Sequence, residues 1–378
     1  MLIEKLKKYS KSGVYPMHMP GHKRNLELLP SGLPYEIDIT EIYDFDDLHN
    51  PSGILHETAR LAAKLYGSTH SFPLVNGSTV GILAAIGAHT NRGDKILVAQ
   101  KCHWSVDNAA TLFGLESTYL TPTVDEASCV SHSISPDAVG ESLDKNPDAK
   151  LVVVTSPSYE GVVSDIAAIA EVAHCRGIPL FVDSAHGAHL GFSKMFPKNA
   201  VQSGADIAVM SLHKTLPALT QCSLLHLCSK RTNTEETKRL LSVLQTSSPS
   251  YILMASIDAC LRVISAESER LFKDYEQNLE RFSKNISALE KLSVLNHGKD
   301  KNRPCFFDFD PGKLVIVTKG TSLSGFELSD ILRNEHKIEL ERACDGYAIA
   351  MTSICDSSEG LERLAEALAA IDNTLCGP

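Results

Sequence analysis

The sequence predicts an α/β protein built around a mostly parallel sheet, and two observations support this prediction. The middle of the chain alternates short apolar segments with segments of helical periodicity, which is typical of a parallel sheet with helices on both faces. The short segments are also rich in Val, Ile and Leu, as strands covered on both faces usually are. The predicted strands span residues 95–99, 151–155, 180–183, 207–211 and 223–227.

Two helices are predicted around these strands from the spacing of their apolar residues. Residues 53–66 carry apolar side chains at helical intervals, and Gly67 provides a natural end. A second helix is predicted over residues 164–176, where Ser164 or Asp165 can cap the first turn.

The two ends of the chain predict further units. The first fifty residues indicate a short helix and an irregular arm rich in Pro, Gly and Asp. A long charged helix over residues 267–292 is expected to bridge two domains, and strands within residues 304–317 follow it. Helices over residues 324–335 and 359–372 complete a small α+β unit. We therefore expect an arm over residues 1–50, a large domain over 51–292 and a small domain over 293–378.

The composition limits the classes of protein to which the chain can belong. The net charge is -10 and no basic stripe is visible, so we expect no nucleic-acid partner. No apolar run approaches the roughly 20 residues that a membrane span needs. The 10 cysteines form no C-x-x-C pair, which indicates reduced thiols, and the charged N-terminus carries no evident signal peptide. These features predict a cytoplasmic protein.

Ligands of open α/β sheets bind beyond the carboxyl ends of the strands. The residues that end or follow the predicted strands are therefore the candidate site residues. Ser78 and Thr79 open an apolar helical segment over residues 80–88. Hydroxyls, backbone N–H groups and the positive end of the helix dipole would together suit a phosphate there. The alternative is that one of the two residues simply caps the helix.

An acid and a lysine follow two later strands. Asp183 ends an apolar strand, where a carboxylate can pair with a protonated pyridine nitrogen, although it could also bind Mg²⁺ or cap a helix. Lys214 follows another strand in the segment Ser211-Leu-His213-Lys214. A lysine at a sheet edge can have a lowered pKa and form an imine, although most lysines are solvated. Ser211 and His213 flank Lys214 at positions that could touch a phosphate.

Three histidines near strand ends are further candidates. His103 follows the first predicted strand and could stack on a flat cofactor ring, or could be a satisfied core histidine. His186 and His189 are three residues apart, but no third ligand at a suitable spacing accompanies them, so we predict no metal site. Taken together, a phosphate-binding helix, a stacking group, an acid and an imine-forming lysine are the groups that pyridoxal 5'-phosphate (PLP) requires.

Several motifs resemble those of the bacterial Orn/Lys/Arg decarboxylases. They are His18-Met-Pro-Gly-His-Lys23, Asp38-Ile-Thr-Glu41, Asp46-Asp-Leu-His49, Asp183-Ser-Ala-His-Gly-Ala-His189, Ser211-Leu-His-Lys214 and Gln245-Thr-Ser-Ser-Pro-Ser-Tyr251. The resemblance implies the aminotransferase-like fold, known as fold type I, with PLP as cofactor. Members of this family usually carry a further C-terminal domain, so we expect a short form.

The resemblance also assigns roles to individual residues. It implies that Lys214 forms the Schiff base, that Asp183 pairs with the pyridine nitrogen and that His103 stacks on the ring. His186 belongs to the cofactor motif, and the phosphate ligands would be Ser78, Thr79, Ser211 and His213. Thr246 or Ser247 would reach the phosphate of a partner subunit, because such enzymes build shared active sites in a homodimer or a higher homo-oligomer. It further implies that the arm residues Glu41, Asp46 and Asp47 meet the substrate; the alternative is that they belong to a solvated, irregular arm.

These residues lead to three hypotheses about function. The first is decarboxylation of lysine, arginine or ornithine to the corresponding amine and CO₂. The second keeps PLP but changes the reaction to transamination, elimination or aldol cleavage, with Arg342 and Arg262 as candidate carboxylate clamps. The third is a non-catalytic relative that binds PLP or regulates a partner.

Overall fold

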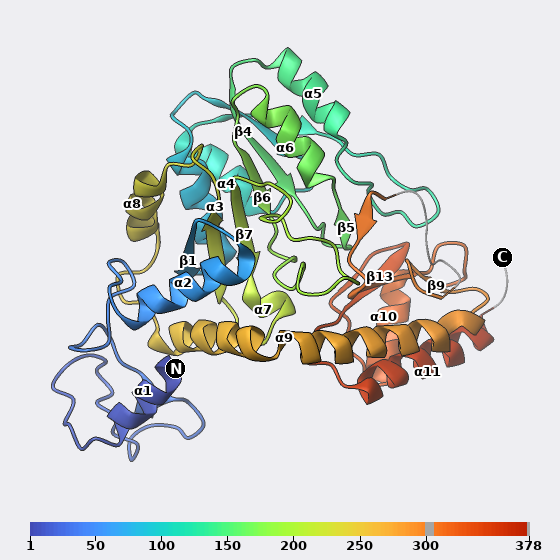
Figure 1. Ribbon diagram of the computed structural model, residues 1–378. Coiled ribbons are helices and arrows are strands. Elements are labelled where there is room, and N and C mark those ends of the chain that lie inside the picture. The colour runs from blue at the N-terminus through green and yellow to red at the C-terminus, as the bar shows by residue number, and fades with distance from the viewer. Residues whose placement is uncertain (299–305, 376–378) are drawn as a thin grey trace.

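The large domain is organised around a seven-stranded sheet in a computed structural model that describes residues 1–298 and 306–375. The strand order is β1-β8-β7-β6-β4-β2-β3 (Figure 1). Neighbours from β7 to β3 run parallel, whereas β8 is antiparallel to both β7 and β1. The strands are β1 (His70–Leu74), β2 (Lys95–Ala99), β3 (Glu116–Leu120), β4 (Ala149–Thr155), β6 (Leu180–Asp183), β7 (Ile207–Ser211) and β8 (Ser223–Leu227).

Apolar side chains cover both faces of this sheet, as the sequence predicts. Because successive side chains of a strand point to opposite faces, each central strand serves two cores. Leu151 and Val153 of β4 pack in one apolar cluster, and Val152 and Val154 pack in the other. The helices over the faces are α2 (Ile54–Tyr66), α3 (Gly77–Ala88), α4 (Trp104–Phe113), α5 (Pro136–Lys145), α6 (Ile166–His174) and α8 (Thr234–Leu244).

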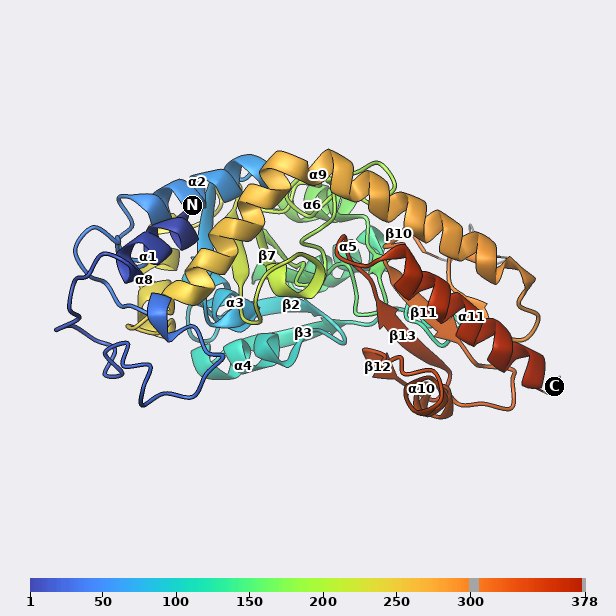
Figure 2. The ribbon, with the colours of Figure 1, turned by 90° about the horizontal axis from the view of Figure 1, so that it is seen from below.

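A single helix, α9 (Tyr251–Asn285), joins the two domains. Figures 1 and 2 show it running along the large domain and continuing beside the small one. The predicted bounds of 267–292 were wrong, because the helix begins at Tyr251, where the Ser250 side chain accepts a hydrogen bond from Leu253 N. Its first half is largely buried and apolar, so it lacks the charged stripe on which the prediction depended.

The small domain packs two helices with a four-stranded antiparallel sheet of order β12-β13-β11-β9. The predicted helices correspond to α10 (Gly325–Asn334) and α11 (Ser358–Thr374). Part of the predicted segment 304–317 lies outside the described residues, and the remainder forms β10 (Asp308–Phe309) and β11. The sheet strands are β9 (Ser293–Val294), β11 (Lys313–Val317), β12 (Arg342–Ala343) and β13 (Tyr347–Met351).

Two contacts attach the outer segments to the large domain. Strand β10 pairs with β5 (Val162–Val163), which fixes the entry into the small domain. The arm begins with α1 (Leu2–Ser10), whose first amide donates to the buried Asp258 of α9 at 2.8 Å. No helix in the described part of the chain is long and apolar enough to cross a membrane.

Candidate active site

Lys214 lies where the end of β7 turns into the short helix α7 (Leu212–Thr215). Two backbone bonds hold this turn, since Ser211 N donates to the Ala185 carbonyl and His213 N donates to the Cys222 carbonyl, each at 3.2 Å. The Lys214 Nζ atom lies 3.1 Å from His186 Nε2. Burial lowers the pKa of Lys214, and the charges of Asp183 and Glu341 oppose this shift. The lysine is therefore held partly desolvated, which favours the nucleophilic amine.

Asp183 ends β6, the strand next to β7, and is 2% exposed. Its Oδ1 atom accepts a hydrogen bond from Ala185 N at 3.1 Å. Desolvation raises the pKa of Asp183, opposed by that hydrogen bond and by the charges of Lys214 and His103. A buried carboxylate with so little compensation would gain from a cationic N–H partner.

The N-terminus of α3 brings two of the predicted phosphate ligands together. Ser78 Oγ lies 2.7 Å from Ser211 Oγ, so the first turn of α3 meets the end of β7. Neither Ser78 nor Thr79 caps the helix; the N-cap is Asn76, and its side chain makes no capping bond. Instead, Asn76 Oδ1 accepts a hydrogen bond from Thr246 N at 3.0 Å. An N-terminus without a side-chain cap leaves its amides available to an anion.

Glycine allows α3 to lie this close to the sheet. A Cβ atom at Gly81 would lie 2.7 Å from Leu74 Cδ1 and 3.1 Å from Val209 Cγ2. Gly77 adopts a positive φ of 73°, which turns the chain from β1 into the helix. Both glycines therefore help to set the position of the first turn relative to Ser211.

His103 begins α4 after β2, and its side chain caps that helix. The ring Nδ1 atom accepts from Ser105 N at 3.3 Å and lies 2.6 Å from Ser105 Oγ. Burial lowers the pKa of His103, with Asp183 raising it and Lys214 lowering it further. The charges of Asp183 and Lys214 thus act on His103, while its capping bonds fix the orientation of the ring.

The small domain contributes residues that the sequence did not reveal. Lys313 Nζ lies 2.8 Å from Nδ1 of His186, and the Tyr159 ring lies 4.7 Å from the His186 ring. The Tyr159 hydroxyl donates to Glu341, which stands just before β12. A lysine at the start of an apolar strand resembles a surface residue in the sequence. Only the tertiary structure places Lys313, the first residue of β11, beside His186, 127 positions earlier.

The arm contacts the loop before α9 in the same chain. His49 Nε2 donates to the Thr246 carbonyl at 2.8 Å, and Thr246 N donates to Asn76. Thr246 therefore lies next to the N-terminus of α3 in the same chain, while the predicted reach of Thr246 or Ser247 to the phosphate of a partner stays a prediction. Of the two candidate clamps, Arg262 pairs with Asp258 at 2.9 Å, and the Arg342 guanidinium lies 5.1 Å over the Tyr159 ring.

The three arm acids lie near the Tyr251 hydroxyl, whose pKa is raised first by burial and then by Glu41, Asp46 and Asp47. Glu41 is exposed, and Asp47 Oδ1 accepts a hydrogen bond from His49 N at 2.8 Å. Asp46 uses both carboxylate oxygens on backbone amides, among them those of Gly53 and Leu55 at the start of α2. The role of these acids in substrate binding stays a prediction. The Asp46 carboxylate stabilises the start of α2.

Replacing Asp46 with Ala is expected to lower the free energy of unfolding by about 1–2 kcal/mol, because the first turn of α2 loses its cap. Urea unfolding of the two proteins measures this difference. Burial raises the pKa of Asp46, but the bonds from Ser52, Asp47, Gly53 and Leu55 outweigh it and lower the pKa below its usual value. The contribution should therefore be complete above the usual pKa of Asp and disappear as acid protonates the folded carboxylate. Equal stability at neutral pH would contradict this role.

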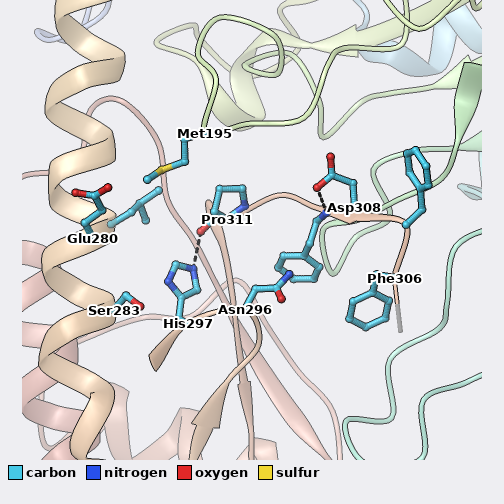
Figure 3. Close-up of a pocket in the computed structure, with 11 residues that line it drawn as sticks. Met195, Glu280, Ser283, Asn296, His297, Phe306, Asp308 and Pro311 are labelled. Atoms are coloured by element: carbon cyan, nitrogen blue, oxygen red, sulfur yellow. Dashed lines mark hydrogen bonds between the residues drawn. The ribbon is translucent and has the colours of Figure 1, made fainter. Parts of the chain in front are cut away.

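A pocket elsewhere in the molecule shares no residue with these predicted site residues. It lies between α9 and the small domain, and Figure 3 shows Glu280 and Ser283 of the helix facing Asn296, His297 and Pro311. His297 Nε2 donates to the Pro311 carbonyl at 2.9 Å (Figure 3). We therefore place the candidate active site at the strand ends around Lys214.

Solved structures of other proteins have the same fold. A lysine decarboxylase from Francisella novicida, LdcF, superposes with a TM-score of 0.85 at 20% identity, covering 98% of this chain and 60% of that structure. The chain thus spans about three fifths of that protein. An alanine–glyoxylate aminotransferase from Nostoc sp. gives a TM-score of 0.66 at 16% identity, covering 84% and 86%. These similarities confirm the predicted aminotransferase-like α/β fold.

Sequence comparisons give the family. An uncharacterised protein of Bacillus subtilis, YaaO, is 40% identical over 338 residues, which are 88% of this chain and 69% of that protein. An arginine decarboxylase of Halalkalibacterium halodurans is 32% identical over 367 residues, which are 95% and 74% of the two chains. The family model for the major domain of Orn/Lys/Arg decarboxylases matches residues 1–314. The resemblance in the motifs is confirmed, and the chain belongs to the Orn/Lys/Arg decarboxylase family.

Proposed function

We propose that this protein is a PLP-dependent decarboxylase that converts a basic L-amino acid into its amine and CO₂. The observation that carries this proposal is the juxtaposition of Lys214 and Asp183 on neighbouring strand ends in a member of this family. Relatives that are 31–33% identical are named arginine decarboxylases, so arginine is the first substrate to test.

The residues at the strand ends fit PLP. In the described part of the chain, the Asp183 carboxylate is hydrogen-bonded by Ala185 N alone, and the N-terminus of α3 has no side-chain cap. The first feature suits a protonated pyridine nitrogen and the second suits a phosphate. Lys214 would hold the cofactor covalently and His103 would cover its ring, while the phosphate ligands would be Ser78, Thr79, Ser211 and His213.

Each residue then has a task in the reaction. When bound, PLP supplies an electron sink for the electron pair of the bond that breaks at the substrate Cα atom. Asp183 holds a proton at the ring nitrogen, because a buried carboxylate favours a cationic partner. The Lys214 amine, once free, would be placed to carry a proton to the substrate Cα atom. His103, whose own orientation is fixed by its capping bond from Ser105 N, would lie against the cofactor ring.

We also propose a homodimer with shared active sites. The arm exposes large apolar side chains, including Tyr43 at 98%, Met17 at 86% and Leu28 at 80% exposure. Such a concentration of exposed apolar surface is typical of an interaction site. A partner subunit that covers the arm would bury these residues next to the loop of Thr246.

The proposed activity predicts CO₂ release from at least one of arginine, lysine and ornithine. The PLP-loaded protein is incubated with each amino acid, CO₂ is measured and the product is identified by mass spectrometry. The variant Lys214→Ala serves as the blank. Absence of turnover with all three would contradict the proposal. Formation of a keto acid without CO₂ would instead favour transamination, with Arg342 beside Tyr159 as the carboxylate ligand, and failure to bind PLP would favour a regulatory relative.

A further inference from the structure

His213, one of the predicted phosphate ligands, is held in place by a backbone carbonyl. It lies in α7 directly before Lys214. Its backbone N–H donates to the Cys222 carbonyl at 3.2 Å, and its ring Nδ1 atom lies 3.0 Å from the same oxygen. Cys222 is itself buried, and its amide donates to the Leu219 carbonyl at 3.1 Å. The His213 ring is therefore anchored on its Nδ1 side.

The contact with Cys222 also decides which ring nitrogen carries hydrogen. A carbonyl oxygen can only accept a hydrogen bond, so Nδ1 of His213 must be the donor. A neutral imidazole has a single N–H group, which leaves Nε2 with a lone pair and no hydrogen. Among the residues that the structure describes, Nε2 has no hydrogen-bond partner. The nitrogen that is available to a ligand is therefore an acceptor.

The ring is neutral at neutral pH when no anion lies beside it. Burial lowers the pKa of His213, the charge of Lys214 acts in the same direction, and together they outweigh the opposing effect of the Cys222 carbonyl. The other groups around the ring carry no charge that would change this result. Burial raises the pKa of the Cys222 thiol to about 11, and the predicted ligands Ser78 and Ser211, whose hydroxyls are 2.7 Å apart, are neutral.

A neutral ring with this arrangement of hydrogens is a poor phosphate ligand. The second pKa of a phosphate monoester is about 6, so above neutral pH its oxygens are negative and only accept hydrogen bonds. The lone pair on Nε2 would face one of these oxygens without a hydrogen between them. A proton on Nε2 turns the ring into a cation that donates from both nitrogens, and charge-assisted hydrogen bonds of this kind are strong.

We propose that His213 takes up one proton from the solvent when the cofactor phosphate binds, and that cofactor affinity is for this reason greater in mild acid than in mild base. One N–H bond forms at Nε2, the Nδ1–H bond towards Cys222 is kept, and no bond of the cofactor breaks. The charge of the ring changes from zero to +1. The inference rests on the proposed role of His213 as a phosphate ligand and adds the protonation state in which it acts.

The direction of the pH dependence follows from linkage. A neighbouring phosphate favours the charged ring, so the pKa of His213 is higher in the complex than in the cofactor-free protein. The contribution of His213 to affinity is complete below the lower of these two pKa values and is lost as pH rises through the higher one. Between them, affinity should fall about tenfold for each pH unit.

The test is calorimetric titration of the full-length, cofactor-free protein with pyridoxine 5'-phosphate. This probe has the ring and the phosphate of the cofactor but no aldehyde, so it forms no imine with Lys214. Titrations slightly above neutral pH, in buffers of different ionisation enthalpy, should show uptake of about one proton by the wild type. In His213→Gln the uptake should fall to about zero, because an amide donates without being protonated. His56→Gln changes an exposed histidine of α2 and should match the wild type.

The pH dependence of the affinity provides a second readout. From about pH 7 to pH 8 the dissociation constant of pyridoxine 5'-phosphate should rise about tenfold for the wild type and little for His213→Gln. Equal proton uptake by these two proteins, or uptake near zero by the wild type, would overturn the inference. His213→Asn, which also provides an amide donor, replaces His213→Gln if the latter does not fold. Failure of the wild type to bind the probe would overturn the proposed cofactor site as well, whereas absence of decarboxylation would leave these titrations unchanged.

Discussion

Replacing Lys214 with Ala should abolish covalent attachment of the cofactor and reduce turnover by at least about a thousandfold. The variant lacks the amine that lies 3.1 Å from His186, and no side chain in its place can form or exchange an imine. Absorbance spectra of the protein mixed with PLP measure the first effect, and CO₂ release from arginine measures the second. Full turnover by this variant would contradict the assignment of Lys214.

The stability of the Lys214→Ala protein provides an internal control. Burial already disfavours the charge of Lys214, so its removal should not lower the free energy of unfolding. Lys230→Ala, which changes an exposed lysine after β8, should retain both the imine absorbance and the activity. A loss of folding in Lys214→Ala would make its inactivity uninformative, and Lys214→Arg, which keeps a long cationic side chain, would then replace it.

The central strands were predictable from the sequence because strands covered on both faces are rich in apolar residues. They are buried on both faces, so their composition is almost purely apolar. The two edge strands escaped prediction for the opposite reason. Strand β1 reads HSFPL and contains Pro73, and β3 reads ESTYL, in which the first three residues are polar. Edge strands tolerate both features because one side of each forms no ladder with a neighbour.

The candidate site divides in the same way between what local sequence reveals and what packing creates. Asp183 and Ser211 are the last residues of two parallel strands that are neighbours in the sheet, so the order of the strands brings them together. Lys313 and Glu341 reach the site because the small domain packs against the large one, where β10 pairs with β5. No local pattern encodes that approach. A lysine at the start of an apolar strand usually faces solvent, and for this reason Lys313 was not predicted as a site residue.

Replacing Asp183 with Asn should reduce turnover by about 10²–10⁴-fold, with a smaller loss of PLP binding. The amide has nearly the same shape as the carboxylate, but it cannot stabilise a proton on the ring nitrogen. Titration with PLP and measurement of CO₂ release separate the two effects. The exposed Asp137→Asn, at the start of α5, is the matched control and should behave as the wild type.

The same substitution should have the opposite effect on the stability of the cofactor-free protein. Desolvation raises the pKa of Asp183 above that of an unfolded Asp, so ionisation in the folded state costs stability. That cost is absent below the unfolded pKa, grows as pH rises towards the folded pKa and is complete above it. At neutral pH the Asn variant should therefore unfold at a higher urea concentration than the wild type, and the difference should disappear in acid. A less stable variant with full turnover would show that Asp183 serves the fold and not the cofactor.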